Sequence, residues 1–247
     1  MTTPTNDLQQ PLSLEPPSEM AGVVSLLKAI VGALLPTDGV AVFTTLYLAV
    51  TEAVVGSAEA QAFEDERFTR ALDVTFANLY FDALRSVAGG GSIPEAWVPL
   101  VEARTRSDVF PLQFALAGMN AHINRDLPVA LVETCTKLGI GLRASSAQHR
   151  DFRKIDRILA STEARVKGRF ITGDLALVDT ALGQLDDCVA MWKVVRARQA
   201  AWVNAETLWA LRRTPSLSAR FLLTLDRMVG FAGRGLLRPV VPAGRVD

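Results

Sequence analysis

Apolar residues recur every three or four positions along most of this chain, which is the spacing of one face of an α-helix. No segment shows the sustained alternation of apolar and polar residues that is typical of a half-buried strand. Short stretches such as PTDG, AGGGSIP and LGIGL separate the periodic segments. The pattern predicts helices near residues 19–35, 39–56, 65–88, 94–105, 110–127, 128–138, 147–168, 174–213 and 216–232.

These helices are predicted to form one domain. No linker long enough to separate two domains follows residue 19, and no repeat of fixed period occurs. We expect an all-α, single-domain bundle of about eight helices over residues 19–235, arranged around a central helix with a polar core. Residues 1–18, which contain four prolines, are expected to be a flexible leader, and residues 236–247 an extended tail.

The central helix is predicted at residues 110–127, because no Lys, Arg, Asp or Glu occurs between Pro111 and Asn124 and a surface helix would carry charges. His122 and Asp126, four residues apart, share one flank of its apolar face. The amides of Gln113, Asn120 and Asn124 lie on the other flank. A buried polar group without a partner costs about 1–3 kcal/mol. These side chains must therefore pair with protein groups or with a ligand.

Pro128 follows this cluster directly. Inside a continuous helix it would leave the Asn124 carbonyl without its backbone donor, at a cost of about 3 kcal/mol unless the helix bends or ends. Backbone carbonyls, amides, an imidazole and a carboxylate would then converge at one bend. The cluster is either a ligand or catalytic site, or a polar network that joins helices, and the sequence leaves both readings open.

A second candidate lies in LDVTFANLYFDALR, where Asp73 shares a helix face with Tyr80 and other apolar residues. A carboxyl group on an apolar face needs either a partner or a raised pKa, and with a raised pKa it can act as a general acid. Pairing of Asp73 with an Arg from another helix is the alternative. Tyr80 is a candidate for binding the substrate.

Two further segments supply candidates for substrate binding. His149 and Asp156 lie beside the apolar stripe of the helix predicted at 147–168, and could meet His122 if that stripe faces the central helix. Trp202 belongs to an aromatic stripe on the long helix that ends near residue 213. Such a stripe is usually part of a core, but it can also form the wall of an apolar pocket.

Composition narrows the classes of partner. The 26 basic and 26 acidic residues cancel, so nothing indicates binding to nucleic acid. The most membrane-like run, VVSLLKAIVGALL, contains Lys28 and is shorter than the roughly 20 residues that cross a bilayer. Two cysteines without a CxxC pair indicate a reducing compartment. We expect a cytoplasmic protein without stable membrane insertion, and a homodimer is compatible with these features.

The segments LDVTFANLYFDAL (72–84), GMNAHINRDLP (118–128) and DFRKIDRIL (151–159) resemble a family of bacterial proteins known only as a domain of unknown function. The resemblance covers most of the chain from residue 38 onward, and implies a helical fold without naming a reaction. The H-x-x-x-D spacing of His122 and Asp126 is also similar to that of the all-α zinc-dependent phospholipase C and nuclease superfamily. Those sites use several more histidines, and His149 is the only other one here. This resemblance therefore allows a single divalent metal, held by His122, Asp126 and further carboxylates.

The sequence contains no nucleotide-binding loop, GxSxG elbow or HExxH motif. It favours an enzyme without a cofactor that acts on a hydrophobic small molecule by cyclisation, isomerisation or hydrolysis. His122, Asp126 and Asp73 are its expected catalytic residues. The alternatives are a mononuclear metal hydrolase that uses the same pair, and a non-catalytic ligand-binding or assembly protein whose polar centre specifies helix register.

Overall fold

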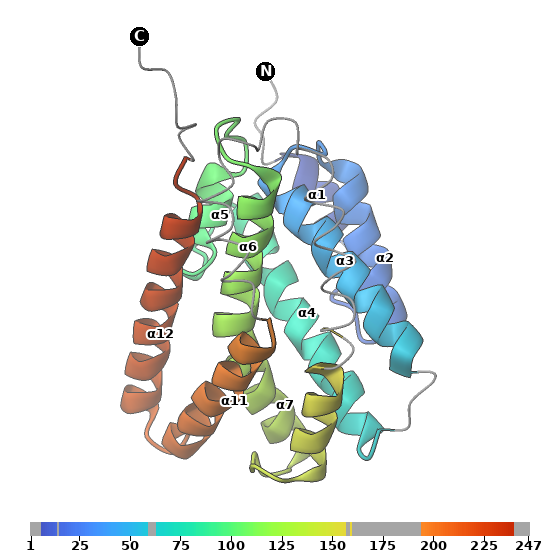
Figure 1. Ribbon diagram of the computed structural model, residues 1–247, viewed down its shortest axis with the longest axis vertical. Coiled ribbons are helices and arrows are strands. Elements are labelled where there is room, and N and C mark those ends of the chain that lie inside the picture. The colour runs from blue at the N-terminus through green and yellow to red at the C-terminus, as the bar shows by residue number, and fades with distance from the viewer. Residues whose placement is uncertain (1–5, 14, 59–62, 157–158, 160–193, 240–247) are drawn as a thin grey trace.

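The computed structural model describes residues 6–13, 15–58, 63–156, 159 and 194–239, and every regular element in these ranges is a helix (Figure 1). The protein is an all-α, single-domain bundle, as the periodicity predicts. The elements are α1 (Asn6–Leu12), α2 (Met20–Ala33), α3 (Gly39–Ala58), α4 (Glu66–Ala88), α5 (Val98–Ala103), α6 (Pro111–Ala121), η1 (His122–Asp126), α7 (Leu127–Leu138), α11 (Val194–Leu211) and α12 (Pro215–Leu236). Residues 147–156 are also helical.

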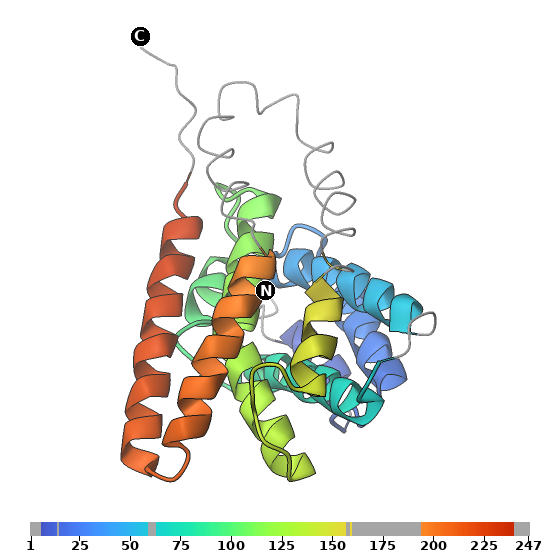
Figure 2. The ribbon, with the colours of Figure 1, turned by 60° about the horizontal axis from the view of Figure 1, so that its bottom comes forward.

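A central rod runs through the bundle and consists of α6, the π-helical turn η1 and α7. The α6 end of the rod contacts α3 and α12, and the α7 end contacts α4 and α11. Figures 1 and 2 show α12 along one edge of the molecule, with α11 folded back beside it. The prediction of a central helix with few charges is confirmed, since eight of the eleven residues of α6 are buried.

Close contact between α3 and α6 depends on a residue without a side chain. A Cβ atom at Gly118 would overlap the Phe43 ring of α3. Glycine is required here by this close approach, and not by a positive φ angle. Small residues on the same helix, Ala115, Ala117 and Ala121, are almost completely buried. The packing of these two helices brings the aromatic side chains of α3 against the central rod.

The predicted leader is wrong for residues 6–12, which form α1 and pack against α2 and α4. Leu8 and Leu12 are buried, and the Leu12 carbonyl accepts a hydrogen bond from Arg85. The four prolines of residues 1–18 led to the prediction of a flexible leader. Only one of them, Pro11, lies inside the helix, and it lies near the end. The rest of the chain before α1 lies outside the described residues.

The predicted end of the last helix is also wrong. The Gly-rich sequence GFAGRGL continues α12 to Leu236, because two of its glycines lie at a helix contact and not in a turn. A Cβ atom at Gly230 would overlap the Glu95 carbonyl, and Leu236 and Leu237 are buried. Residues 240–247 of the predicted tail, and residues 160–193 of two predicted helices, lie outside the described residues.

One helix in the described part of the chain is long and apolar enough to cross a membrane by length and composition. It is the Gly39–Gly56 part of α3. Half of this span is buried inside the bundle.

Candidate functional site

The site begins at the π-helical turn η1, where the central rod changes its hydrogen-bond register. The Leu127 N–H donates to the carbonyl of His122, five residues earlier, and Pro128 follows without an N–H to donate. The helix therefore accommodates the proline by widening for one turn and does not end there, which was one of the two outcomes that the sequence left open. Such turns are frequent at functional sites. Here the turn carries both His122 and Asp126.

His122 and Asp126 form a buried pair. His122 Nδ1 lies 3.1 Å from Asp126 Oδ2, and the residues are 2% and 0% exposed. Burial lowers the pKa of His122 below its ordinary value, and the hydrogen bond and charge of Asp126 oppose this shift only in part. The imidazole is therefore neutral at pH 7. Since its Nδ1 faces a carboxylate acceptor, Nδ1 carries the proton and Nε2 carries the free lone pair.

Asp126 is itself held by two more donors. Trp97 Nε1 lies 3.0 Å from Oδ2, and Arg125 Nη1 lies 2.8 Å from Oδ1. Asp226 of α12 accepts hydrogen bonds from the backbone N–H groups of Glu95 and Ala96, directly before Trp97. Asp126 therefore has few directions left in which to move. Asp126 in turn fixes the orientation of the imidazole through Nδ1, as in other sites where a carboxylate orients a histidine.

Aromatic rings enclose the imidazole on its other sides. Phe76 of α4 stacks on it at 3.6 Å between ring centroids and an interplanar angle of 6°. Tyr47 of α3 meets it edge-on at 4.6 Å. Nε2 is buried and has no hydrogen-bond partner among the described residues. An acceptor with no partner in such surroundings costs about 1–3 kcal/mol, so it is a group that a ligand could satisfy.

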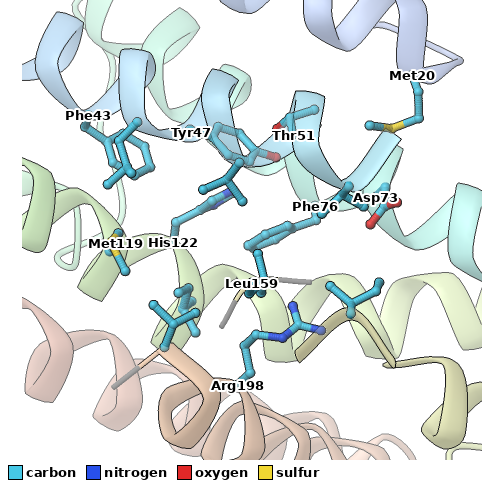
Figure 3. A pocket seen from close by; sticks show the side chains of 16 residues that line it. Met20, Phe43, Tyr47, Thr51, Asp73, Phe76, Met119, His122, Leu159 and Arg198 are labelled. Atoms are coloured by element: carbon cyan, nitrogen blue, oxygen red, sulfur yellow. The ribbon is translucent and has the colours of Figure 1, made fainter. Parts of the chain in front are cut away.

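A cavity of about 110 Å³ lies beside this imidazole. Its wall is mostly apolar and comes from α2, α3, α4, α6, η1 and α11, together with Ile155 and Leu159; the side chains include Phe43, Leu46, Tyr47, Val50, Phe76, Met119, Ile123, Ile155, Leu159 and Val194. We call this cavity the deep pocket. Figure 3 shows His122 between Tyr47 and Met119, with Asp73 and Met20 on the opposite side of Phe76. Apolar cavities of about 150 Å³ hold a molecule the size of benzene, so the space suits one small ring or a short chain.

Two charged groups line the deep pocket. Burial raises the pKa of Asp73 to about 7, and the charge of Arg198 opposes the shift. Arg198 reaches the same space from α11 (Figure 3), where its Nε lies 2.7 Å from Asp156 and its Nη2 donates to the Phe152 carbonyl. Asp73 has no hydrogen bond within the described part of the chain. Because its pKa is about 7, half of its population is protonated near neutral pH.

Three predicted binding residues do not reach the pocket. Asn120 donates to the Val229 carbonyl of α12 and accepts from Asn124, so both amides serve as links between or along helices. Gln113 accepts from the Phe110 N–H and donates to the carbonyls of Leu236 and Arg238. The structure therefore gives no support to their prediction as substrate ligands. The polar network that the sequence offered as an alternative is correct for this flank of the helix.

Four other predicted residues lie outside the pocket wall. Tyr80 is fully buried and its hydroxyl is hydrogen-bonded to Thr44 at 2.6 Å. His149 accepts from the Ser145 N–H and lies 4.5 Å from the Trp202 ring, so neither it nor Trp202 meets His122. Trp202 donates to Glu206 and packs in a separate apolar cluster. Asp156 contributes only through Arg198, with which it forms a buried ion pair.

Three residues of the pocket wall, Tyr47, Phe76 and Arg198, were not predicted from the sequence. Phe76 lies within the conspicuous segment around Asp73, and its spacing of three residues from Asp73 could have indicated it. Burial raises the pKa of Tyr47, and the charges of Asp73 and Asp126 add to this effect, so its hydroxyl is neutral. Arg198 is one Arg among many, and no pattern distinguishes it.

The residues present give little support to a metal centre. No group of three His, Cys, Asp or Glu side chains that could hold an ion occurs among the residues that the structure describes. His122 Nδ1 and both Asp126 oxygens are engaged with protein donors or acceptors. Of this pair only His122 Nε2 is left as a ligand, and a catalytic zinc ordinarily has three protein ligands.

Residues 20–239 match the model of a family of unknown function, DUF5995. No curated protein and no solved structure matches the chain.

Proposed function

Because the chain belongs to DUF5995, a family of unknown function, we propose its function from the site alone: it is an enzyme that moves a proton on a small apolar substrate. His122 Nε2 is the general base, and Asp126 orients it. Asp73 is the general acid. The reaction class is isomerisation or cyclisation, in which one proton is taken from carbon and another is returned.

One observation carries this proposal. The lone pair of His122 Nε2 is buried, has no partner among the described residues and borders a cavity, while Nδ1 is tied to Asp126. Most buried side-chain polar atoms are satisfied by protein or ordered water, so an unpaired nitrogen that also borders a cavity supports a ligand there. Burial lowers the pKa of this imidazole, so it is a weaker base than in water, but its lone pair is free to accept a proton at neutral pH.

Each residue of the site has a separate role in the proposed reaction. His122 removes a proton, and the resulting imidazolium is stabilised by the Asp126 carboxylate at 3.1 Å. Asp73, with a pKa of about 7, is protonated often enough at neutral pH to donate to a developing negative charge. The Phe76 and Tyr47 rings keep water from His122. Proton transfer by a positioned side chain contributes roughly 10²–10⁴-fold to a rate.

The runner-up, a mononuclear metal hydrolase, would need ligands besides His122 Nε2. Elemental analysis of the purified protein separates it from our proposal, since it requires a stoichiometric metal. The non-catalytic alternative fits the flank of Asn120 and Asn124, whose amides are linked within the protein. It does not account for an unpaired nitrogen beside a cavity.

A carbon acid of suitable size tests the base directly. The probe is 5-nitrobenzisoxazole: a base takes its ring C–H proton, the N–O bond breaks with the electron pair going to oxygen, and the coloured product is 2-cyano-4-nitrophenolate. We expect the wild-type protein to accelerate this reaction, and His122→Gln to lower the rate by about 10²-fold or more. The rate should be level above pH 7 and fall at lower pH as His122 is protonated.

The matched control is the chain's other histidine. His149→Gln should leave the rate unchanged, because His149 lies outside the pocket. A folded His122→Gln variant with the wild-type rate, or a wild-type protein no faster than imidazole in solution, would overturn the proposal.

A further inference from the structure

A second cavity adjoins the deep pocket. Its volume is about 260 Å³, and its wall is formed by α2, α3, Phe63 and α4. Met20, Val54 and Asp73 line both cavities, so their side chains stand at the junction. Figure 3 shows Met20 and Asp73 close together at the end of the deep pocket remote from Phe43. We call the second cavity the vestibule.

The wall of the vestibule is apolar near the junction with the deep pocket and charged at the rim. Near the junction it is apolar, with Met20, Val54 and Val55. At the rim are Glu66 and Arg70, which are largely exposed and paired with each other at 2.9 Å. Asp73 is the carboxyl group in the wall without a hydrogen bond from the described residues, while the charges at the rim neutralise one another. The vestibule therefore offers an apolar path with one polar recognition point.

We propose that the two cavities form one elongated binding site for a neutral amphiphile with a hydroxyl group. Its apolar end lies in the deep pocket beside His122, and its hydroxyl hydrogen-bonds to Asp73, the group that donates a proton in the proposed reaction, where the deep pocket meets the vestibule. The inference rests on the proposed function only in taking the deep pocket as the place where substrate binds. A hydroxyl suits Asp73 in either protonation state, because it donates to the carboxylate and accepts from the carboxylic acid.

The two-cavity arrangement explains why the deep pocket alone is small for a substrate. Ligand pockets commonly enclose about 300–1,000 Å³, whereas the deep pocket encloses about 110 Å³. With the vestibule included, the space reaches the lower end of that range. An extended chain that passes Met20 and Val54 would bury apolar surface along its whole length, and this burial sets the affinity expected below.

The homologous 1-alkanols from 1-butanol to 1-decanol test this inference by calorimetric titration. We expect affinity to rise about threefold to fourfold for each added methylene, and to keep rising beyond the length that the deep pocket alone would hold. Each alcohol should bind about threefold to tenfold more tightly than its methyl ether, which has no hydroxyl donor. Asp73→Leu should abolish this preference while the dependence on chain length remains.

A variant that fills only the vestibule gives the decisive comparison. Val55 lines the vestibule but not the deep pocket, so Val55→Trp should weaken 1-decanol at least tenfold and leave 1-butanol within twofold. Retained binding of 1-butanol shows that the variant is folded. The control is Val203→Trp on the exposed side of α11, which should change neither affinity.

Two results would overturn the inference. The first is an affinity that stops rising at the shortest alcohols, and the second is a Val55→Trp variant that binds 1-decanol as tightly as the wild-type protein does. His122→Gln removes the proposed base but keeps the apolar wall, so the rise of affinity with chain length and the effect of Val55→Trp on 1-decanol should persist in this variant. Loss of the proposed catalysis would therefore leave the binding result intact, and the two proposals fail separately.

Discussion

At the scale of single residues, the site depends on two titratable groups. The same apolar surroundings lower the pKa of one and raise the pKa of the other. Burial lowers the pKa of His122 and raises that of Asp73 to about 7, so burial favours the neutral form of each group. Neutral groups of this kind accept and donate protons near pH 7, where ordinary carboxyl groups cannot donate. The stability of the fold must therefore depend on pH through Asp73.

This dependence has a definite sign. Between pH 3.8 and about 7 the folded protein keeps a proton on Asp73 that the unfolded chain releases, so the free energy of unfolding falls as the pH rises through this window. Asp73→Asn removes the titration. We expect the variant's free energy of unfolding, relative to the wild type, to increase by about 1–3 kcal/mol from pH 5 to pH 8 in urea denaturation. Asp82→Asn, at an exposed carboxyl group of the same helix, should show no such increase, and a level difference for Asp73→Asn would contradict the assignment.

At the scale of elements, the α3–α6 contact positions the aromatic wall of the pocket. Gly118→Ala places a methyl group where the Phe43 ring lies, and the ring cannot move far because it also packs on Trp97 and Tyr80. We expect a loss of about 1–3 kcal/mol in the free energy of unfolding, although alanine is the better helix former by about 1 kcal/mol. Gly32→Ala in α2, where nothing lies within 4 Å of an added Cβ, is the control and should be neutral or stabilising. Equal effects of the two substitutions would contradict the packing account.

The sequence predicted the existence and type of the main helices because apolar periodicity reports directly on burial. It also predicted that His122 and Asp126 lie in the interior, since α6 has no charges to face water. It could not predict the π-helical turn, because Pro128 is compatible with a kink, a break or a change of register. Nor could it separate His122, which faces a cavity, from Asn120, which faces α12. That difference depends on which helices pack on each flank.

At the scale of the whole molecule, the site is assembled from segments that are distant in the sequence. Residues from α2, α3, α4, η1 and α11 meet around one pocket, and Asp226 of α12 fixes the segment before Trp97, which binds Asp126. Such an assembly requires the whole bundle, including α1, which a reading of the prolines alone excluded from the fold. Tyr47 and Arg198 escaped prediction for the same reason, since single residues on separate helices share no local pattern.

The tautomer of His122 is the most direct test of the whole account. Nitrogen-15 NMR of His149→Gln, which retains His122 as its only histidine, distinguishes protonated from unprotonated ring nitrogens. We predict a neutral ring at pH 7 with the proton on Nδ1, a titration midpoint below 6.5, and a shift of the Nε2 signal when 1-butanol is added. A ring protonated at pH 7, or a neutral ring with its proton on Nε2, would contradict the assignment of His122 as the base.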